Sequence, residues 1–200
     1  MRSIKNNNSK KTESILISFA LIAIAGISYA LSVFLTIISS NNQNFNLLST
    51  FWLTVCMLIF FVIIPFFIAR KIYGIDYRCL NINLKNYTIY ILIGFIFLKY
   101  ILKINSINIF RNLIVASSEE FLFRFIIFEI LLRVFDKKYA IVIGSILFAL
   151  ILHLNVDVLI NIISKFPMSI VLYILYDKFG YENAFALHWL NNSLVDFFYM

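Results

Sequence analysis

Residues 14–39 read SILISFALIAIAGISYALSVFLTIIS, a run without a single charged side chain. A helix needs about 20 apolar residues to cross a hydrocarbon core about 30 Å thick, so this run is long enough to span a membrane. Basic residues precede it, as they do in a signal peptide. The apolar region of a signal peptide has only about 7–15 residues, however, and no A-x-A-like cleavage site follows here. We therefore expect an uncleaved membrane anchor.

The composition of the whole chain points the same way. Of the 200 residues, 62% are hydrophobic and 14% are charged, against roughly 45–50% apolar and about 25% charged in soluble domains. The mean hydropathy is +0.92. A water-soluble monomer is therefore excluded. The net charge is +7, but the basic residues lie between the apolar runs, which favours the lipid bilayer over nucleic acid as a partner.

Further apolar runs follow the first one along the chain. They are too long and too weakly alternating to be barrel strands, and a membrane-spanning backbone must satisfy its own hydrogen bonds. The sequence therefore predicts an all-α membrane protein, a polytopic bundle of about seven transmembrane helices. The predicted spans are 14–39, 48–69, 88–105, 108–133, 139–154, 158–176 and 180–198.

The predicted spans divide the chain into three parts. We expect a polar, basic N-terminal tail at 1–13, N-terminal transmembrane helices at 14–105, and a polar-residue-containing core at 108–198. Most basic residues fall in segments that are cytosolic if the N-terminus is inside, which is the usual bias. The sequence therefore predicts a multi-pass protein of the cell membrane with a cytosolic N-terminus. Two spans, 88–105 and 108–133, are joined by almost no loop, so an error there would give six or eight spans.

The fourth predicted span contains charged side chains in the stretch VASSEEFLFRFIIFEI at 115–130. Each charge at a helix centre costs about 2.5–3.5 kcal/mol on the insertion scale, so it needs a partner or a function. Glu120 and Arg124 are four residues apart and can form an ion pair on one helix face. Glu119 lies about 100° around the helix and has no such basic partner in its own helix. It is therefore the unpaired carboxylate of this span.

Both histidines of the chain also lie in apolar spans. Either of them alone is explained by structural polar packing between helices. His188 and Asn192, however, are four residues apart and project from one helix face. With His153 and Glu119, they bring an unpaired carboxylate, two imidazoles and an amide from three spans toward one interior, which favours catalysis over packing.

These residues resemble the three motifs of the CPBP (Abi) intramembrane proteases, which include type II CAAX prenyl endopeptidases and bacterial bacteriocin-processing and self-immunity proteins. EExxxR lies at 119–124, a histidine ends the next span at 153, and HxxxN lies at 188–192. The resemblance covers about 108–198 and implies a bacterial plasma membrane protein. Two positions depart from the family pattern. Phe148 precedes His153 by five residues instead of four, and Phe125 replaces the glycine that commonly follows the motif arginine.

The resemblance implies an endopeptidase acting on a peptide or membrane-protein substrate, such as a CAAX-like tail or a bacteriocin leader peptide. Glu119 with His153 would activate water, and His188 with Asn192 would stabilise the oxyanion. Glu120 and Arg124 would hold the helix in place around the site.

Three alternatives remain open at this point. Glu119, His153 and His188 are able to form a zinc site, although HExxH is absent and the base would then be Glu120, which Arg124 already engages. We favour the scheme without a metal cofactor. A non-catalytic scaffold or immunity protein of the same fold would bind a peptide or a partner membrane protein. A small transporter is disfavoured because internal symmetry and Gly/Pro-broken helices are missing.

Overall fold

The computed structural model describes residues 2–40, 44–152 and 158–199, with side chains described for 8–40, 44–150 and 159–198. Within these ranges the chain forms seven helices and no strand, which confirms the predicted all-α membrane protein. Several helices contain a π-helical segment, labelled η, without interruption of the helix.

In chain order, the elements are α1 (Arg2–Ser39), α2 (Phe45–Met57) with η1 (Leu58–Ile63) and α3 (Ile64–Tyr73), a 3₁₀ turn η2 (Tyr77–Cys79), α4 (Leu84–Ile96) with η3 (Phe97–Ile101), α5 (Ser106–Glu120) with η4 (Phe121–Ile127) and α6 (Phe128–Leu132), α7 (Lys137–Leu147) with η5 (Phe148–Leu152), α8 (Val158–Ile160) with η6 (Asn161–Lys165) and α9 (Phe166–Phe179), and α10 (Tyr181–Tyr199). Three of the described helices are long and apolar enough to cross a membrane, namely Asn8–Ser39, Phe45–Tyr73 and Leu84–Ile101.

Two helix boundaries differ from the predicted ones. Helix α1 begins at Arg2 and so runs through the predicted tail at 1–13. The junction between the third and fourth spans is a true turn. The helix ends at Ile101, Lys103 adopts a φ of 58°, and the Ile104 amide donates a 3.0 Å hydrogen bond to the Leu98 carbonyl. This left-handed residue reverses the chain within a few positions, because it closes the helix end in the manner of a C-cap.

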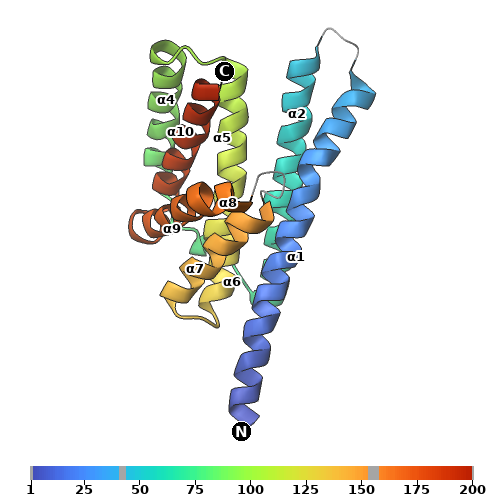
Figure 1. Cartoon of the computed structure of the whole chain (residues 1–200), viewed down its shortest axis with the longest axis vertical. Coiled ribbons are helices and arrows are strands. Elements are labelled where there is room, and N and C mark those ends of the chain that lie inside the picture. The colour runs from blue at the N-terminus through green and yellow to red at the C-terminus, as the bar shows by residue number, and fades with distance from the viewer. Residues whose placement is uncertain (1, 41–43, 153–157, 200) are drawn as a thin grey trace.

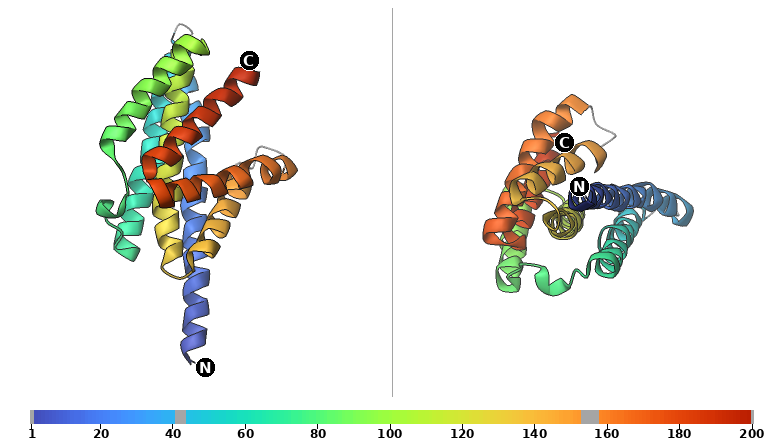
Figure 2. Two further views of the ribbon diagram at one scale, coloured as in Figure 1. Left: turned by 90° about the vertical axis from the view of Figure 1, so that its left-hand side faces the viewer. Right: turned by 90° about the horizontal axis from the view of Figure 1, so that it is seen from below.

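The helix formed by α5, η4 and α6 lies at the centre of the molecule. In the end view of Figure 2 the other helices surround it. Every residue of 122–128 is buried, including Arg124. The charged helix occupies the centre because only there can neighbouring helices supply partners for its ionic groups. Large apolar side chains on α1, α2 and α4 face outward, as expected for surfaces in contact with lipid.

Helix α9 takes a different direction from the other long helices. It runs across the long axis of the molecule in Figure 1 and in both views of Figure 2, whereas α1, α2, α5 and α10 run more nearly along it. This crossing helix passes beside the middle of the central helix. Its length and hydropathy predict a helix but not its direction, so the number of membrane crossings stays a prediction.

The start of α10 is fixed by main-chain groups that precede α4. The Tyr181 amide donates a 2.7 Å hydrogen bond to the Asn81 carbonyl, and the Glu182 carboxylate accepts a 3.0 Å bond from the Asn83 amide. Gly180 joins α9 to α10 with a φ of +97°, and a Cβ there would lie 3.0 Å from the Glu182 carboxylate. Glycine is therefore required at this sharp turn, which aims α10 at the central helix.

We expect Gly144→Ala to destabilise the protein by about 1–3 kcal/mol, the usual cost of overpacking. A Cβ at Gly144 would overlap the hydroxyl of Tyr173, which packs against the central helix. Gly26→Ala is the matched control, because a Cβ at that helical glycine meets no atom within 4 Å and alanine is intrinsically better in a helix by about 1 kcal/mol. Thermal unfolding in detergent compares the two. Equal unfolding temperatures would contradict the described packing of Gly144 on Tyr173.

Candidate active site

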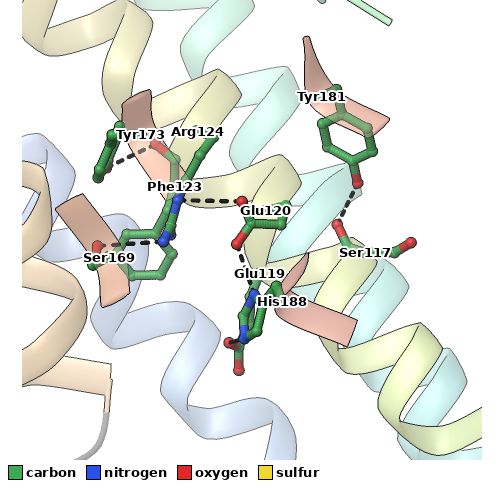
Figure 3. A network of polar contacts seen from close by, with 9 residues as sticks. All are labelled: Ser117, Glu119, Glu120, Phe123, Arg124, Ser169, Tyr173, Tyr181 and His188. Carbon is green, nitrogen blue, oxygen red and sulfur yellow. Dashed lines mark hydrogen bonds and ion pairs between the residues drawn. The ribbon is translucent and has the colours of Figure 1, made fainter. Parts of the chain in front are cut away.

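An imidazole from α10 lies between two adjacent carboxylates of α5. His188 Nδ1 is 2.7 Å from Glu120 Oε1, and His188 Nε2 is 3.5 Å from Glu119 Oε2. Glu120 is fully buried, and the other two side chains are almost fully buried. Figure 3 shows the ring bridging the two residues. The geometry therefore joins Glu119 to a neighbour from another helix, which the spacing within its own helix does not reveal.

The two contacts of His188 differ in strength. The 2.7 Å separation is that of a short hydrogen bond. Because a carboxylate oxygen only accepts hydrogen bonds, we assign the proton to His188 Nδ1. The 3.5 Å separation from Glu119 is longer than a normal hydrogen bond, for which about 2.7–3.2 Å is usual. Glu120 thus orients the ring, whereas Glu119 keeps oxygen lone pairs available for another group.

The predicted pair of Glu120 and Arg124 is present. Arg124 Nε lies 3.2 Å from Glu120 Oε2, and both side chains are fully buried. The guanidinium also lies 4.6 Å from the centre of the Phe148 ring and 4.7 Å from that of Tyr173, and it donates a 3.3 Å bond to Ser169 Oγ. These cation–π contacts and the ion pair offset the cost of the buried charge.

Phe148 belongs to this cluster despite its shifted position in the sequence motif. Its ring contacts the Arg124 guanidinium and also packs edge-on against the His188 ring, with centroids 5.9 Å apart and planes at 78°. An edge-to-face arrangement of this kind is favourable for aromatic rings. The five-residue spacing to His153 therefore does not remove Phe148 from the site.

Two tyrosines bond to carbonyl groups of the central helix on either side of Glu120, one in α5 and one in the π-helical segment η4. The Tyr181 hydroxyl donates a 2.6 Å bond to the Ser117 carbonyl, and the Tyr173 hydroxyl donates a 3.0 Å bond to the Phe123 carbonyl. π-helical turns leave carbonyl groups in irregular positions and often occur at functional sites. Sequence reasoning missed both tyrosines and Ser169, because nothing in their local spacing links them to the fourth span.

Of the two remaining predicted site residues, the structure describes Asn192 but not His153. Asn192 is half-buried one helical turn after His188, and within the described part of the chain its side chain makes no hydrogen bond. It does not join the Glu119–His188 contact directly. His153 lies outside the described residues.

The zinc alternative is consistent with part of this geometry. Glu119 and His188 face each other, and Glu120 holds the far ring nitrogen as a carboxylate commonly holds a metal-ligating histidine. The third predicted ligand, His153, is not among the residues that the structure describes. Within the described ranges no group of three histidine, cysteine, aspartate or glutamate side chains is placed to hold a metal. Zinc therefore stays an alternative prediction.

The cluster places buried carboxylates and an imidazole together inside a helical membrane protein, and such groups are able to exchange protons. Residues 104–194 match the family model of the type II CAAX prenyl endopeptidase Rce1-like proteins. The matched segment contains every described residue of the cluster, and the predicted resemblance to the CPBP proteases is confirmed. No curated protein and no solved structure matches the chain. The family that this segment matches is a family of proteases.

Proposed function

We propose that the protein is an intramembrane endopeptidase that hydrolyses a peptide bond of a lipidated or membrane-associated substrate, with Glu119 as the general base. The observation that carries this proposal is the His188 bridge between Glu119 and Glu120 in a buried environment. Glu120 is engaged by both Arg124 and His188, whereas Glu119 has only the longer of the two imidazole contacts. A carboxylate in this position is able to accept a proton from water.

His188 has two roles in the proposed reaction, one for each ring nitrogen. Nδ1–H donates to Glu120, which holds the ring in place. Nε2–H is the proposed donor to an oxyanion.

The proposed reaction follows from these positions. Glu119 takes a proton from water while the water oxygen attacks the scissile carbonyl carbon. The carbonyl oxygen becomes an oxyanion that accepts hydrogen bonds from His188 Nε2–H and from the Asn192 amide, which lies on the same helix face. When the C–N bond breaks, the proton held by Glu119 passes to the leaving amine. By the family resemblance, His153 assists Glu119 in orienting the water.

The substrate range of this function is testable in cells. We expect membranes from cells with the protein to contain cleaved peptides that are missing from cells producing Glu119→Gln, when new N-termini are profiled by mass spectrometry. CAAX-like tails and bacteriocin leader peptides are the two proposed classes. Identical profiles for the parent and the variant would contradict a protease function.

The metal question has its own prediction. Under the proposed scheme, His188→Gln and Asn192→Ala each lower turnover by about 10²–10³-fold, the range for loss of one oxyanion donor, and metal content does not change. Under the zinc alternative, His188→Gln loses stoichiometric metal and a chelator inactivates the parent, whereas Asn192→Ala retains the metal. Elemental analysis of the purified parent and both variants decides between the schemes.

We also propose that the N-terminus and the 71–87 segment face the cytosol, because basic residues concentrate there. The native cysteines make a direct test possible, since Cys79 in this segment is exposed and Cys56 is buried. A membrane-impermeant maleimide should label Cys79 in inverted membrane vesicles and not in intact cells. Cys79→Ser is the control for specific labelling. Labelling in intact cells would reverse the proposed orientation.

A further inference from the structure

One face of the helix formed by α8, η6 and α9 is polar along much of its length. Its polar residues recur every four positions at Asn161, Lys165, Ser169 and Tyr173. Residues four apart on a helix lie within about 40° of one another, so these side chains share one face. Asn161, Ser169 and Tyr173 are buried. This face therefore points into the protein.

The direction of this face is set by two contacts with the central helix. Ser169 Oγ accepts a hydrogen bond from the Arg124 guanidinium, and the Tyr173 hydroxyl donates one to the Phe123 carbonyl. Figure 3 shows both residues beside the cluster that contains Glu120 and His188. The polar face of this helix thus lies against the candidate active site.

Lys165 is the charged member of this face, one turn before Ser169. It is half-buried on the face whose Ser169 contacts Arg124, and Glu119 is among the groups within reach of its charge. The two side chains do not form an ion pair, and among the described residues Lys165 has no hydrogen bond or ion-pair partner. A half-buried ammonium in a membrane protein is costly when it lacks a partner. Within the described ranges this cation therefore has no anion of the protein beside it, which leaves it available to an incoming anion.

We propose that Lys165 is a specificity-determining residue that binds a carboxylate of the peptide substrate close to the scissile bond. This inference rests on the proposed endopeptidase function. A substrate carboxylate placed near Glu119 and Glu120 would be repelled unless a cation compensates it, and Arg124 is already engaged by Glu120. Lys165 is the described cation that supplies this compensation. The carboxylate comes either from the free C-terminus of the substrate or from an acidic side chain.

The test uses the full-length protein in proteoliposomes and quenched-fluorescent farnesylated peptides. One pair differs only in a C-terminal carboxylate or carboxamide, and a second pair, both amidated, differs only in aspartate or asparagine next to the cleavage site. The parent should prefer one acidic peptide by about 10–100-fold in kcat/KM, mainly through KM, as expected for a charge-assisted hydrogen bond. Lys165→Met should abolish this preference and leave kcat for the neutral peptides within about threefold.

Lys99→Met is the matched control, because Lys99 is also half-buried but belongs to η3, outside the polar face defined above. It should keep the parental preference. The pair that loses its preference in Lys165→Met identifies the source of the carboxylate. Equal acidic-to-neutral ratios in the parent and in Lys165→Met would overturn the proposal.

Binding separates this inference from the proposed function. Peptide affinities are measured by fluorescence anisotropy in Glu119→Gln, with and without Lys165→Met. Tighter binding of an acidic peptide that depends on Lys165 supports the carboxylate site, whether or not the peptide is cleaved. If no peptide is cleaved, only the protease proposal fails for these peptides. The opposite outcome is cleavage that depends on Glu119 while acidic and neutral peptides bind equally, or do not bind at all. That outcome overturns the Lys165 proposal alone.

Discussion

Glu119→Gln is expected to lower peptide-bond hydrolysis by about 10²–10⁴-fold, the usual contribution of a positioned general base. Glutamine has nearly the same shape and still contacts His188, but it cannot take a proton from water. The substitution also removes a buried negative charge, so membrane insertion and thermal stability should be preserved or improved. Initial rates on a substrate found by N-terminal profiling, measured in proteoliposomes, test the expectation.

Glu129→Gln is the control for this experiment. Glu129 is a half-buried carboxylate on the same continuous helix, but it lies nearer to Arg133 than to the cluster around His188. Its replacement should leave turnover within a few-fold of the parent. Parental activity in Glu119→Gln would rule out Glu119 as the base, whatever the behaviour of Glu129→Gln.

Arg124→Met should lower the free energy of unfolding by about 3–5 kcal/mol, because it leaves Glu120 buried with one partner fewer. Arg124 and Glu120 are both 0% exposed, and the guanidinium also contacts Ser169 and two aromatic rings. His188 still bonds to the other oxygen of Glu120. The substitution should therefore lower stability and also disturb the orientation of the His188 ring. Thermal and denaturant unfolding in detergent measure the loss.

The surface ion pair of Lys137 and Asp177 provides the matched control. Their atoms are only 2.8 Å apart, yet the Lys137 side chain is 57% exposed. Exposed pairs contribute about 0–1 kcal/mol, so Lys137→Met should have a small effect. The double variant Glu120→Gln with Arg124→Met should recover part of the loss, because it removes the unpaired charge. A single Arg124→Met as stable as Lys137→Met would contradict the structural role of the buried pair.

The sequence predicts the helices well because each apolar run is one helix long. Every predicted span overlaps a helix of the structure, including the pair 88–105 and 108–133 that almost no loop separates. Hydropathy reports length and polarity but not direction, so it could not show that α9 crosses the bundle. It also could not place the start of α1 at Arg2, since the polar residues before Ser14 carry no apolar period.

The sequence predicts those contacts of the candidate site that join residues of one helix, and it does not predict the contacts between helices. Glu120 with Arg124 is a four-residue spacing, and its ion pair is present. The bond from His188 to Glu120 joins residues 68 positions apart, and no spacing rule gives such a pair. For the same reason, the polar face that carries Ser169 and Tyr173 is visible as a repeat of four but not as a neighbour of Arg124. The catalytic roles of the site residues stay predictions.

Two hydrogen bonds that hold the start of α10 come from residues that precede the segment matched by the family model. The groups that hold this helix, the Asn81 carbonyl and the Asn83 amide, lie outside the matched segment 104–194. Both belong to the peptide backbone, which almost any amino acid supplies. These two hydrogen bonds to the helix that bears His188 therefore do not depend on which side chains stand at positions 81 and 83. A fragment starting at residue 104 would lose this tether, so we expect it to hold the start of α10 less firmly than the whole chain does.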